Sequence, residues 1–225
     1  AERLPLLEPY AIQSVSCCKF PLFLTTDGTV LMLGACPYEG SLRDLDPVHV
    51  LKTDERIVSV SCGTSHALLL SEDGNAYSMG RNHQGQLGIG KSRKTVHNPT
   101  RIGLSTKITY ICAREDHSMF IDETNEVFTC GLNTSGVLGF PLRERKIPKP
   151  KRVPKLKNIS SIALGGSFCF FKDDTGPVYV AGANDFCQLA LDNRESNLVS
   201  PVQCLPEEMW EIMTGPRRHT KSARK

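Results

Sequence analysis

Residues 57–90, IVSVSCGTSHALLLSEDGNAYSMGRNHQGQLGIG, decide the fold of this chain. An alternating segment at residues 57–60 leads through a turn of small residues to an apolar run at residues 67–70. The polar turn Glu-Asp-Gly then leads to a third apolar segment at residues 76–79. Short apolar segments separated by Asp-Gly turns are typical of strands that pair in hairpins. The stretch therefore predicts one small antiparallel sheet.

The same order of segments occurs four times along the chain. The first unit starts at Ile12 and is shorter, since its Gly28 precedes Gly74 of the second unit by 46 residues. The later units are related by a step of 51 residues, and a fixed period of this kind is the signature of a repeat architecture. The positions that recur at this step are Gly80, Gly131 and Gly182; Asn82, Asn133 and Asn184; Leu87, Leu138 and Leu189; and Val60, Ile111 and Ile162.

One small sheet cannot bury both of its faces alone. We therefore expect an all-β fold in which four sheets stack around an axis as the blades of a β-propeller. The predicted units are an N-terminal segment at residues 1–11, repeats at about residues 12–56, 57–107, 108–158 and 159–213, and a basic, disordered tail at residues 214–225. Residues 207–213 (EEMWEIM) fit either one helical turn or the start of another blade.

Two sets of residues follow from this arrangement. The tight turns need positive φ angles, which Gly28, Gly74 and Gly176 would supply and for which Asn125 can substitute. The residues predicted to face inward between blades are Val15, Val60, Ile111, Ile162, Leu24, Leu70, Ile121 and Phe171.

The repeat resembles that of the regulator-of-chromosome-condensation family, whose pattern is roughly V-x-x-G-x-x-H-x-x-x-L-x-x-D-G-x-V-x-x-W-G-x-N-x-x-G-Q-L-G. The resemblance covers residues 12 to about 205 and is strongest in the second unit. The matching residues there are Gly63, His66, Leu70, Asp73, Gly74, Gly80, Asn82, Gly85, Gln86, Leu87 and Gly88. The departures are Leu33, Met79, Cys130 and Ala181 at the family's Trp, Arg114 at the first glycine, Phe168 at the His, and Cys187 and Ala190 at two later glycines of the fourth unit.

The resemblance implies a propeller of the seven-bladed type, of which four blades are visible here. Open sheet edges at the two ends of such an arc are an aggregation liability. We therefore expect one of three situations: a part of a larger propeller, a truncated isoform, or an arc that a partner completes.

Composition bounds the class of protein. Of 225 residues, 40% are apolar and 23% charged, and no apolar run approaches the ~20 residues of a membrane helix. The nine cysteines include no C-x-x-C pair, and there is no signal-peptide pattern, which together predict a reducing compartment, the cytoplasm or the nucleus. The net charge of +3 is too small to indicate a nucleic-acid binder by itself.

Residues 85–92, GQLGIGKS, match the phosphate-binding pattern G-x-x-x-x-G-K-[ST]. That function needs a buried strand before the loop and a helix directly after it. Here four polar residues precede the loop, and the following RKTVHNPT has no helical stripe. The repeat also explains Gly85, Leu87 and Gly88, because Gly136, Leu138 and Gly139 occupy the same positions. We therefore expect no nucleotide site here.

His66 and His117 occupy one repeat position, at which Pro21 and Phe168 stand in the other units. We expect each His to form a hydrogen bond with a neighbouring loop, and His49, His83 and His97 to lie on the surface. No G-x-S-x-G or H-E-x-x-H signature is present. The sequence therefore predicts no catalytic, cofactor-binding or metal residue, no cofactor and no small-molecule substrate, and a protein that is not an enzyme.

Two basic segments remain. Residues 143–157 (RERKIPKPKRVPKLK, from Arg143 to Lys157) predict an extended surface segment, either a plain solvated face or a contact for DNA phosphates or an acidic protein. The tail at residues 217–225 fits a localisation signal, a nucleic-acid arm or an end without function.

The resemblance implies two functions. The first is a non-catalytic protein-interaction propeller that acts as a scaffold or regulator, either of a small GTPase or within a larger multidomain protein. The alternative is a guanine-nucleotide exchange factor for a Ran-like GTPase on chromatin, in which an inserted loop acts as a wedge. The constant step of 51 residues leaves no room for such an insertion in the later units, which favours the scaffold.

Overall fold

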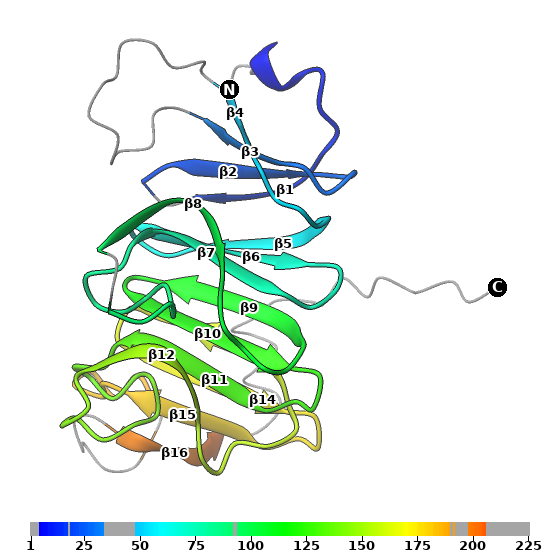
Figure 1. The fold of residues 1–225 in the computed structure, drawn as a ribbon. Coiled ribbons are helices and arrows are strands. Elements are labelled where there is room, and N and C mark those ends of the chain that lie inside the picture. Colours follow the sequence, from blue (N-terminus) through cyan, green and yellow to red (C-terminus); the bar gives the residue numbers. More distant parts are fainter. Residues whose placement is uncertain are drawn as a thin grey trace.

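The computed structural model describes residues 5–17, 19–33, 48–91, 94–189 and 191, and the backbone of residues 198–205 (Figure 1). The described part consists of strands and one short 3-10 helix, η1, at Pro5–Leu7. The strands of the first two blades are β1 (Ile12–Cys17), β2 (Pro21–Thr25), β3 (Val30–Leu33), β4 (Val48–Leu51), β5 (Ile57–Cys62), β6 (His66–Ser71), β7 (Ala76–Arg81) and β8 (Thr95–Arg101). Those of the next two are β9 (Ile108–Arg114), β10 (His117–Asp122), β11 (Val127–Leu132), β12 (Lys146–Arg152), β13 (Ile159–Leu164), β14 (Phe168–Asp173), β15 (Val178–Gly182) and β16 (Leu198–Leu205).

The strands form four separate antiparallel sheets, each of four strands in chain order. We call them blades 1 to 4. Figure 1 shows them stacked one after another, from the blue first blade to the yellow and orange fourth. The first strand of each blade contacts the first strand of the next, so β1, β5, β9 and β13 lie along a common axis. The predicted all-β fold with four propeller blades is confirmed.

The turn residues adopt the predicted backbone. Gly28, Gly74 and Gly176 have φ angles of 87°, 83° and 121°, and Asn125 takes the same left-handed region at 61°. Asn is one of the few residues with a side chain that tolerates this region. The hairpins between second and third strands are therefore fixed by local chemistry.

The glycines before the long loops of blades 2, 3 and 4 lie in equivalent surroundings. Gly80, Gly131 and Gly182 have φ angles of 106°, 112° and 111°. At each of them a Cβ would overlap the carbonyl oxygen of a turn in the same blade, at Ser65, Asp116 and Ser167 respectively. The step of 51 residues therefore marks equivalent points on successive sheets.

The core lies between the blades. Leu22 and Leu24 of β2 are fully buried against Leu69 of β6, which belongs to the same apolar cluster. On the other face of blade 2, Leu68 packs in a cluster with Phe120 of blade 3. Burial of one such side chain stabilises the fold by about 1.5–3 kcal/mol. The stacking of blades therefore supplies the apolar burial that a single sheet lacks.

One inner-face prediction is wrong. Val15 is 52% exposed, whereas the other predicted inner-face residues are buried or, at Val60, half-buried. Val15 pairs with Phe23, so both lie on the face of blade 1 that is turned away from blade 2. That face is covered in part by Leu7 of the N-terminal segment, and no described blade packs on it. The repeat pattern does not indicate which unit ends the stack.

The predicted tail at residues 214–225 and the segment at residues 207–213 lie outside the described residues. Among the described residues, no helix has the length and apolar character required to cross a membrane.

Candidate interaction face

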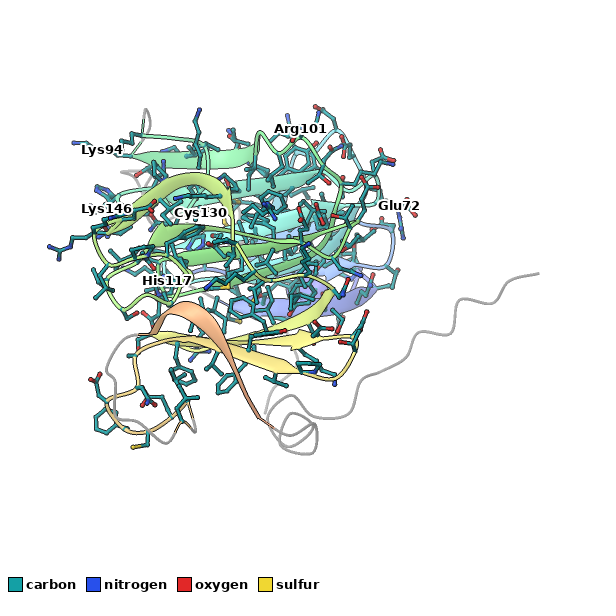
Figure 2. All side chains as sticks on the ribbon, turned by 90° about the horizontal axis from the view of Figure 1, so that it is seen from below. Glu72, Lys94, Arg101, His117, Cys130 and Lys146 are labelled. Carbon is teal, nitrogen blue, oxygen red and sulfur yellow. The ribbon has the colours of Figure 1, made fainter. Side chains whose placement is uncertain are left out.

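The connections between strands fall on two opposite ends of the blades. We call the end that carries residues 19–20, 63–65, 82–91, 115–116, 133–145 and 165–167 the loop face. We call the end that carries residues 26–29, 72–75, 102–107, 123–126, 153–158 and 174–177 the turn face. Figure 2 shows Lys94 and Lys146 at one end of the sheets and Glu72 at the other. The loop face has the longer connections and is the candidate functional site.

A buried asparagine shapes the described part of the long loop in blades 2, 3 and 4. The Asn82 carboxamide oxygen accepts a hydrogen bond from the Leu87 amide at 3.1 Å, and its Nδ2 donates to the Gly90 carbonyl at 2.9 Å. Asn133 accepts from Leu138 at 3.1 Å, and Asn184 from Leu189 at 3.0 Å. These side-chain hydrogen bonds therefore hold the described parts of the loops from within.

A chain of hydrogen bonds joins blades 2 and 3 beneath the loop face. The Ser118 hydroxyl donates to the Gln86 carbonyl at 2.6 Å, so it accepts from Nε2 of His66 at 2.8 Å. The Gln86 side chain donates to Asp116 at 2.8 Å. The imidazole of His66 is completely buried, and burial, with a smaller effect from the charge of His117, lowers its pKa to about 3. The ring is therefore neutral and links the blades.

His117 joins blades 3 and 4 in a different way. Its Nδ1 lies 2.8 Å from the Leu132 carbonyl and its Nε2 lies 2.9 Å from the Gly166 carbonyl. Burial lowers the pKa of His117, while the two carbonyl contacts act in the opposite direction. The predicted contact with a neighbouring loop is therefore found for His117, at Gly166, whereas His66 contacts Ser118 of strand β10 in the next blade.

We call these hydrogen bonds between neighbouring blades the inter-blade seam. The sequence predicts contacts for the two histidines but not for Ser118 and Gln86. Ser118 is equivalent to Ala67 and Cys169, so its type does not recur at the step of 51. The contact does recur, because the Cys169 thiol lies 3.1 Å from the Val137 carbonyl, the equivalent of Gln86. The sequence signals this contact only if the equivalent residues are compared by their ability to donate a hydrogen bond, which Ser118 and Cys169 share although they differ in type.

The segment that matches a phosphate-binding loop lies in the β7–β8 connection. Gly85, Gly88 and Gly90 have φ angles of 84°, 70° and 88°. Ser92 lies outside the described residues, and the chain from Lys94 onward enters strand β8. The segment is therefore part of a repeat loop that is followed by a strand, which does not match the strand–loop–helix context of a nucleotide site.

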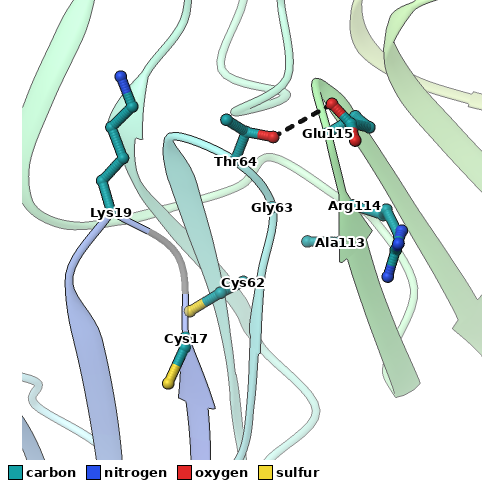
Figure 3. A pocket seen from close by; sticks show the side chains of 8 residues that line it. All are labelled: Cys17, Lys19, Cys62, Gly63, Thr64, Ala113, Arg114 and Glu115. Carbon is teal, nitrogen blue, oxygen red and sulfur yellow. Dashed lines mark hydrogen bonds between the residues drawn. The ribbon is translucent and has the colours of Figure 1, made fainter. Parts of the chain in front are cut away.

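A shallow hollow of about 380 Å³ opens on the loop face near the axis (Figure 3). Thr64 of blade 2 donates to the Glu115 carboxylate of blade 3 at 3.2 Å across its rim. Cys17 and Cys62, which come from neighbouring blades and form no disulfide, both line it (Figure 3). Its lining residues are Cys17, Lys19, Cys62, Gly63, Thr64, Ala113, Arg114 and Glu115. Within the described part of the chain, no group of three or more His, Cys, Asp or Glu side chains could hold a metal ion.

The basic run at residues 143–157 is divided by the fold. Its first part lies on the loop face, its middle forms strand β12, and Lys155 and Lys157 lie on the turn face. Within it, Lys151 pairs with Glu144 at 2.6 Å and Arg152 pairs with Glu126 at 2.9 Å. The middle of the run is therefore an extended surface strand, as predicted, but the run does not form one continuous patch. The basic tail at residues 217–225 lies outside the described residues.

Comparison with known proteins identifies the repeat. The sequence profile of the regulator of chromosome condensation (RCC1) repeat matches residues 73–121 and 124–171, and a second profile of the same description matches residues 57–86. The probable E3 ubiquitin-protein ligase HERC6 of Homo sapiens is 30% identical over 193 residues, which cover 81% of this chain and 19% of HERC6. Protein RCC2 of Homo sapiens is 32% identical over 151 residues, which cover 65% of this chain and 28% of RCC2.

Solved structures show the same fold. The crystal structure of Prp20p from Saccharomyces cerevisiae superposes with a TM-score of 0.77 at 20% identity, over 93% of this chain and 54% of Prp20p. The chain therefore spans about half of that propeller and less than a third of the two human relatives. The profile matches, the step of 51 residues and the equivalent surroundings of its loop glycines show that this chain belongs to the regulator of chromosome condensation (RCC1) repeat family.

Proposed function

We propose that this chain is a non-catalytic interaction module whose loop face binds a partner protein, as a scaffold or regulator. The observation that carries the proposal is the inter-blade seam. Gln86 bonds to Asp116, and His117 lies 2.9 Å from the Gly166 carbonyl. These contacts hold the loops of three blades as one preorganised surface. Preorganisation lowers the entropic cost of binding, so a surface of this kind suits recognition.

Similar proteins support a small GTPase as one candidate partner. Prp20p is described with its binding to Gsp1p and histones. The likeness to Prp20p is one of fold, and the matched human relatives are far longer than this chain. We therefore propose partner binding in general, with a Ran-like GTPase as the first partner to test. We propose the cytoplasm or the nucleus as the place where the chain acts.

The alternative is guanine-nucleotide exchange on such a GTPase, which the similarity to Prp20p and RCC2 favours. Exchange by displacement needs a protruding wedge that loosens the bound phosphates. Two long loops can be compared, and each is 13 residues long: residues 82–94 of blade 2 and residues 133–145 of blade 3. Residues 92–93 of the first loop lie outside the described residues. Neither carries an insertion that could serve as a wedge, and this supports the scaffold.

One experiment separates the two functions. The chain is used to capture partners from a lysate, and the release of labelled nucleotide is then measured on any recovered GTPase. We expect capture without faster release. Release accelerated above the intrinsic rate would contradict the scaffold and establish exchange, and a chain that captures no protein would contradict both.

A matched pair of variants locates the contact. Charge reversal at Arg143 changes the loop face, and charge reversal at Lys157 changes the turn face; both side chains are exposed. We expect Arg143→Glu to weaken capture and Lys157→Glu to leave it unchanged. The reverse result would place the contact on the turn face.

A further inference from the structure

A second hollow on the loop face lies between the long loop of blade 2 and strand β12 of blade 3. Its volume is about 350 Å³. Three lysines surround it, Lys91 and Lys94 from blade 2 and Lys146 from blade 3, together with His83. We call it the lysine pocket. Figure 2 shows Lys94 and Lys146 extending from the same end of the sheets.

The pocket is built by close packing of backbone. The Gly90 amide donates to the Pro148 carbonyl at 2.8 Å, and Lys146 donates to the His83 carbonyl at 3.2 Å. A Cβ on Gly85 would come within 2.6 Å of the Cα of Pro148, so only glycine allows this approach. The glycines of the phosphate-like motif thus bring two blades together around a group of lysines.

The positive charge of the pocket is not neutralised within the described chain. The ion pairs among the described residues involve Arg56, Lys151 and Arg152, and none of the three pocket lysines. The nearby carboxylates have other partners, since Glu144 pairs with Lys151 and Asp116 accepts from Gln86. Three ammonium groups around one hollow therefore present an open site for negative charge.

We propose that the lysine pocket binds an acidic segment of a partner protein, through Asp and Glu side chains that enter between Lys91, Lys94 and Lys146. The proposal rests on the proposed function and names the class of partner. A pocket of about 350 Å³ suits one or two carboxylate side chains.

A nucleic acid fits the pocket less well. Apart from the imidazole of His83, no aromatic ring lines it, so it offers no series of rings on which successive bases could stack. Lysine is a compact point charge that suits carboxylates without a fixed bidentate geometry.

The test measures binding of a fluorescein-labelled peptide of ten glutamates to the full chain by fluorescence anisotropy at low salt. We expect binding that weakens as salt is raised, because exposed charges are screened within a Debye length of about 10 Å at 0.1 M. The variant Lys94→Glu/Lys146→Glu should lose about tenfold or more in affinity, since reversed charges repel the peptide.

The matched control is Lys52→Glu/Lys157→Glu, which changes the net charge equally at exposed positions away from the loop face. In about 0.1 M salt it should bind within about twofold of the unchanged chain, because charges more than about 10 Å away are then largely screened. Thermal unfolding checks that each variant is folded, and the milder Lys94→Gln/Lys146→Gln replaces the reversal variant if that one does not fold. Equal losses in both pairs of variants would overturn the proposal.

Duplex DNA of matched charge forms the second arm. Tighter binding of DNA than of the peptide, lost in the pocket variant, would overturn the proposal in favour of a nucleic-acid site. Partner capture that is unaffected by the pocket variant would refute the lysine pocket and leave the proposed function standing. If the pocket variant loses both peptide binding and one captured partner selectively, the result supports the lysine pocket and the proposed function.

Discussion

At the scale of single residues, the loop glycines provide the sharpest stability test. Gly131 has a φ angle of 112°, and a Cβ there would overlap the Asp116 carbonyl. We expect Gly131→Ala to lower the free energy of unfolding by about 1–3 kcal/mol, measured by urea denaturation.

Gly103 supplies the control, because a Cβ there would meet nothing within 4 Å. Gly103→Ala should change the free energy of unfolding by no more than about 0.5 kcal/mol. Equal effects of the two substitutions would show that position 131 carries no special constraint.

The buried His66 makes stability depend on pH. Its folded pKa of about 3 lies below the value of about 6.5 in the unfolded chain, so the unfolded state binds more protons between these values. The contribution of His66 to stability is complete above about pH 6.5 and is lost as the pH falls, by about 1.4 kcal/mol per pH unit.

The variant His66→Phe isolates this effect, since Phe168 occupies the same position in blade 4. The free energy of unfolding, measured from pH 7 to pH 4.5, should fall more steeply in the original chain than in the variant. Parallel curves would mean that the imidazole is not buried in neutral form.

At the scale of elements, removal of the Ser118 hydroxyl would break the hydrogen bonds that join blades 2 and 3 at this position. Ser118→Ala would leave the Nε2–H of His66 without its partner and remove the donor to the Gln86 carbonyl. Loss of a partner for a buried polar group costs about 1–3 kcal/mol. We expect this loss in chemical denaturation.

Ser118→Cys is the conservative comparison, because Cys169 makes the equivalent contact between blades 3 and 4. It should retain more than half of the stability that the alanine variant loses. If the cysteine and alanine variants were equally destabilised, the contact to the Gln86 carbonyl would not be the cause.

The elements also show what the sequence could predict. The strands, the positive-φ turns and the equivalence of Gly80, Gly131 and Gly182 follow from local chemistry repeated at a fixed step. The link from Ser118 to Gln86 does not, because contacts between blades depend on which atoms meet in space. The prediction that Val15 faces inward was wrong for a related reason, because a repeat pattern assumes that every blade has a neighbour on both sides.

The candidate site shows the same division. The histidine contacts were predictable in kind, because His66 and His117 share a repeat position. The lysine pocket was not, since Lys91 and Lys94 meet Lys146 from a different repeat. The basic run that includes Lys146 was visible in the sequence, but the register of strand β12 decides which of its charges reach the loop face.

At the scale of the whole molecule, four stacked blades present one loop face, and the account depends on that face being the contact for a partner. Hydrogen–deuterium exchange of the chain, with and without a captured partner, tests this most directly. We expect protection at residues 82–91 and 133–145, with little change at residues 72–75 and 123–126 on the turn face. Protection confined to the turn-face residues would contradict the account.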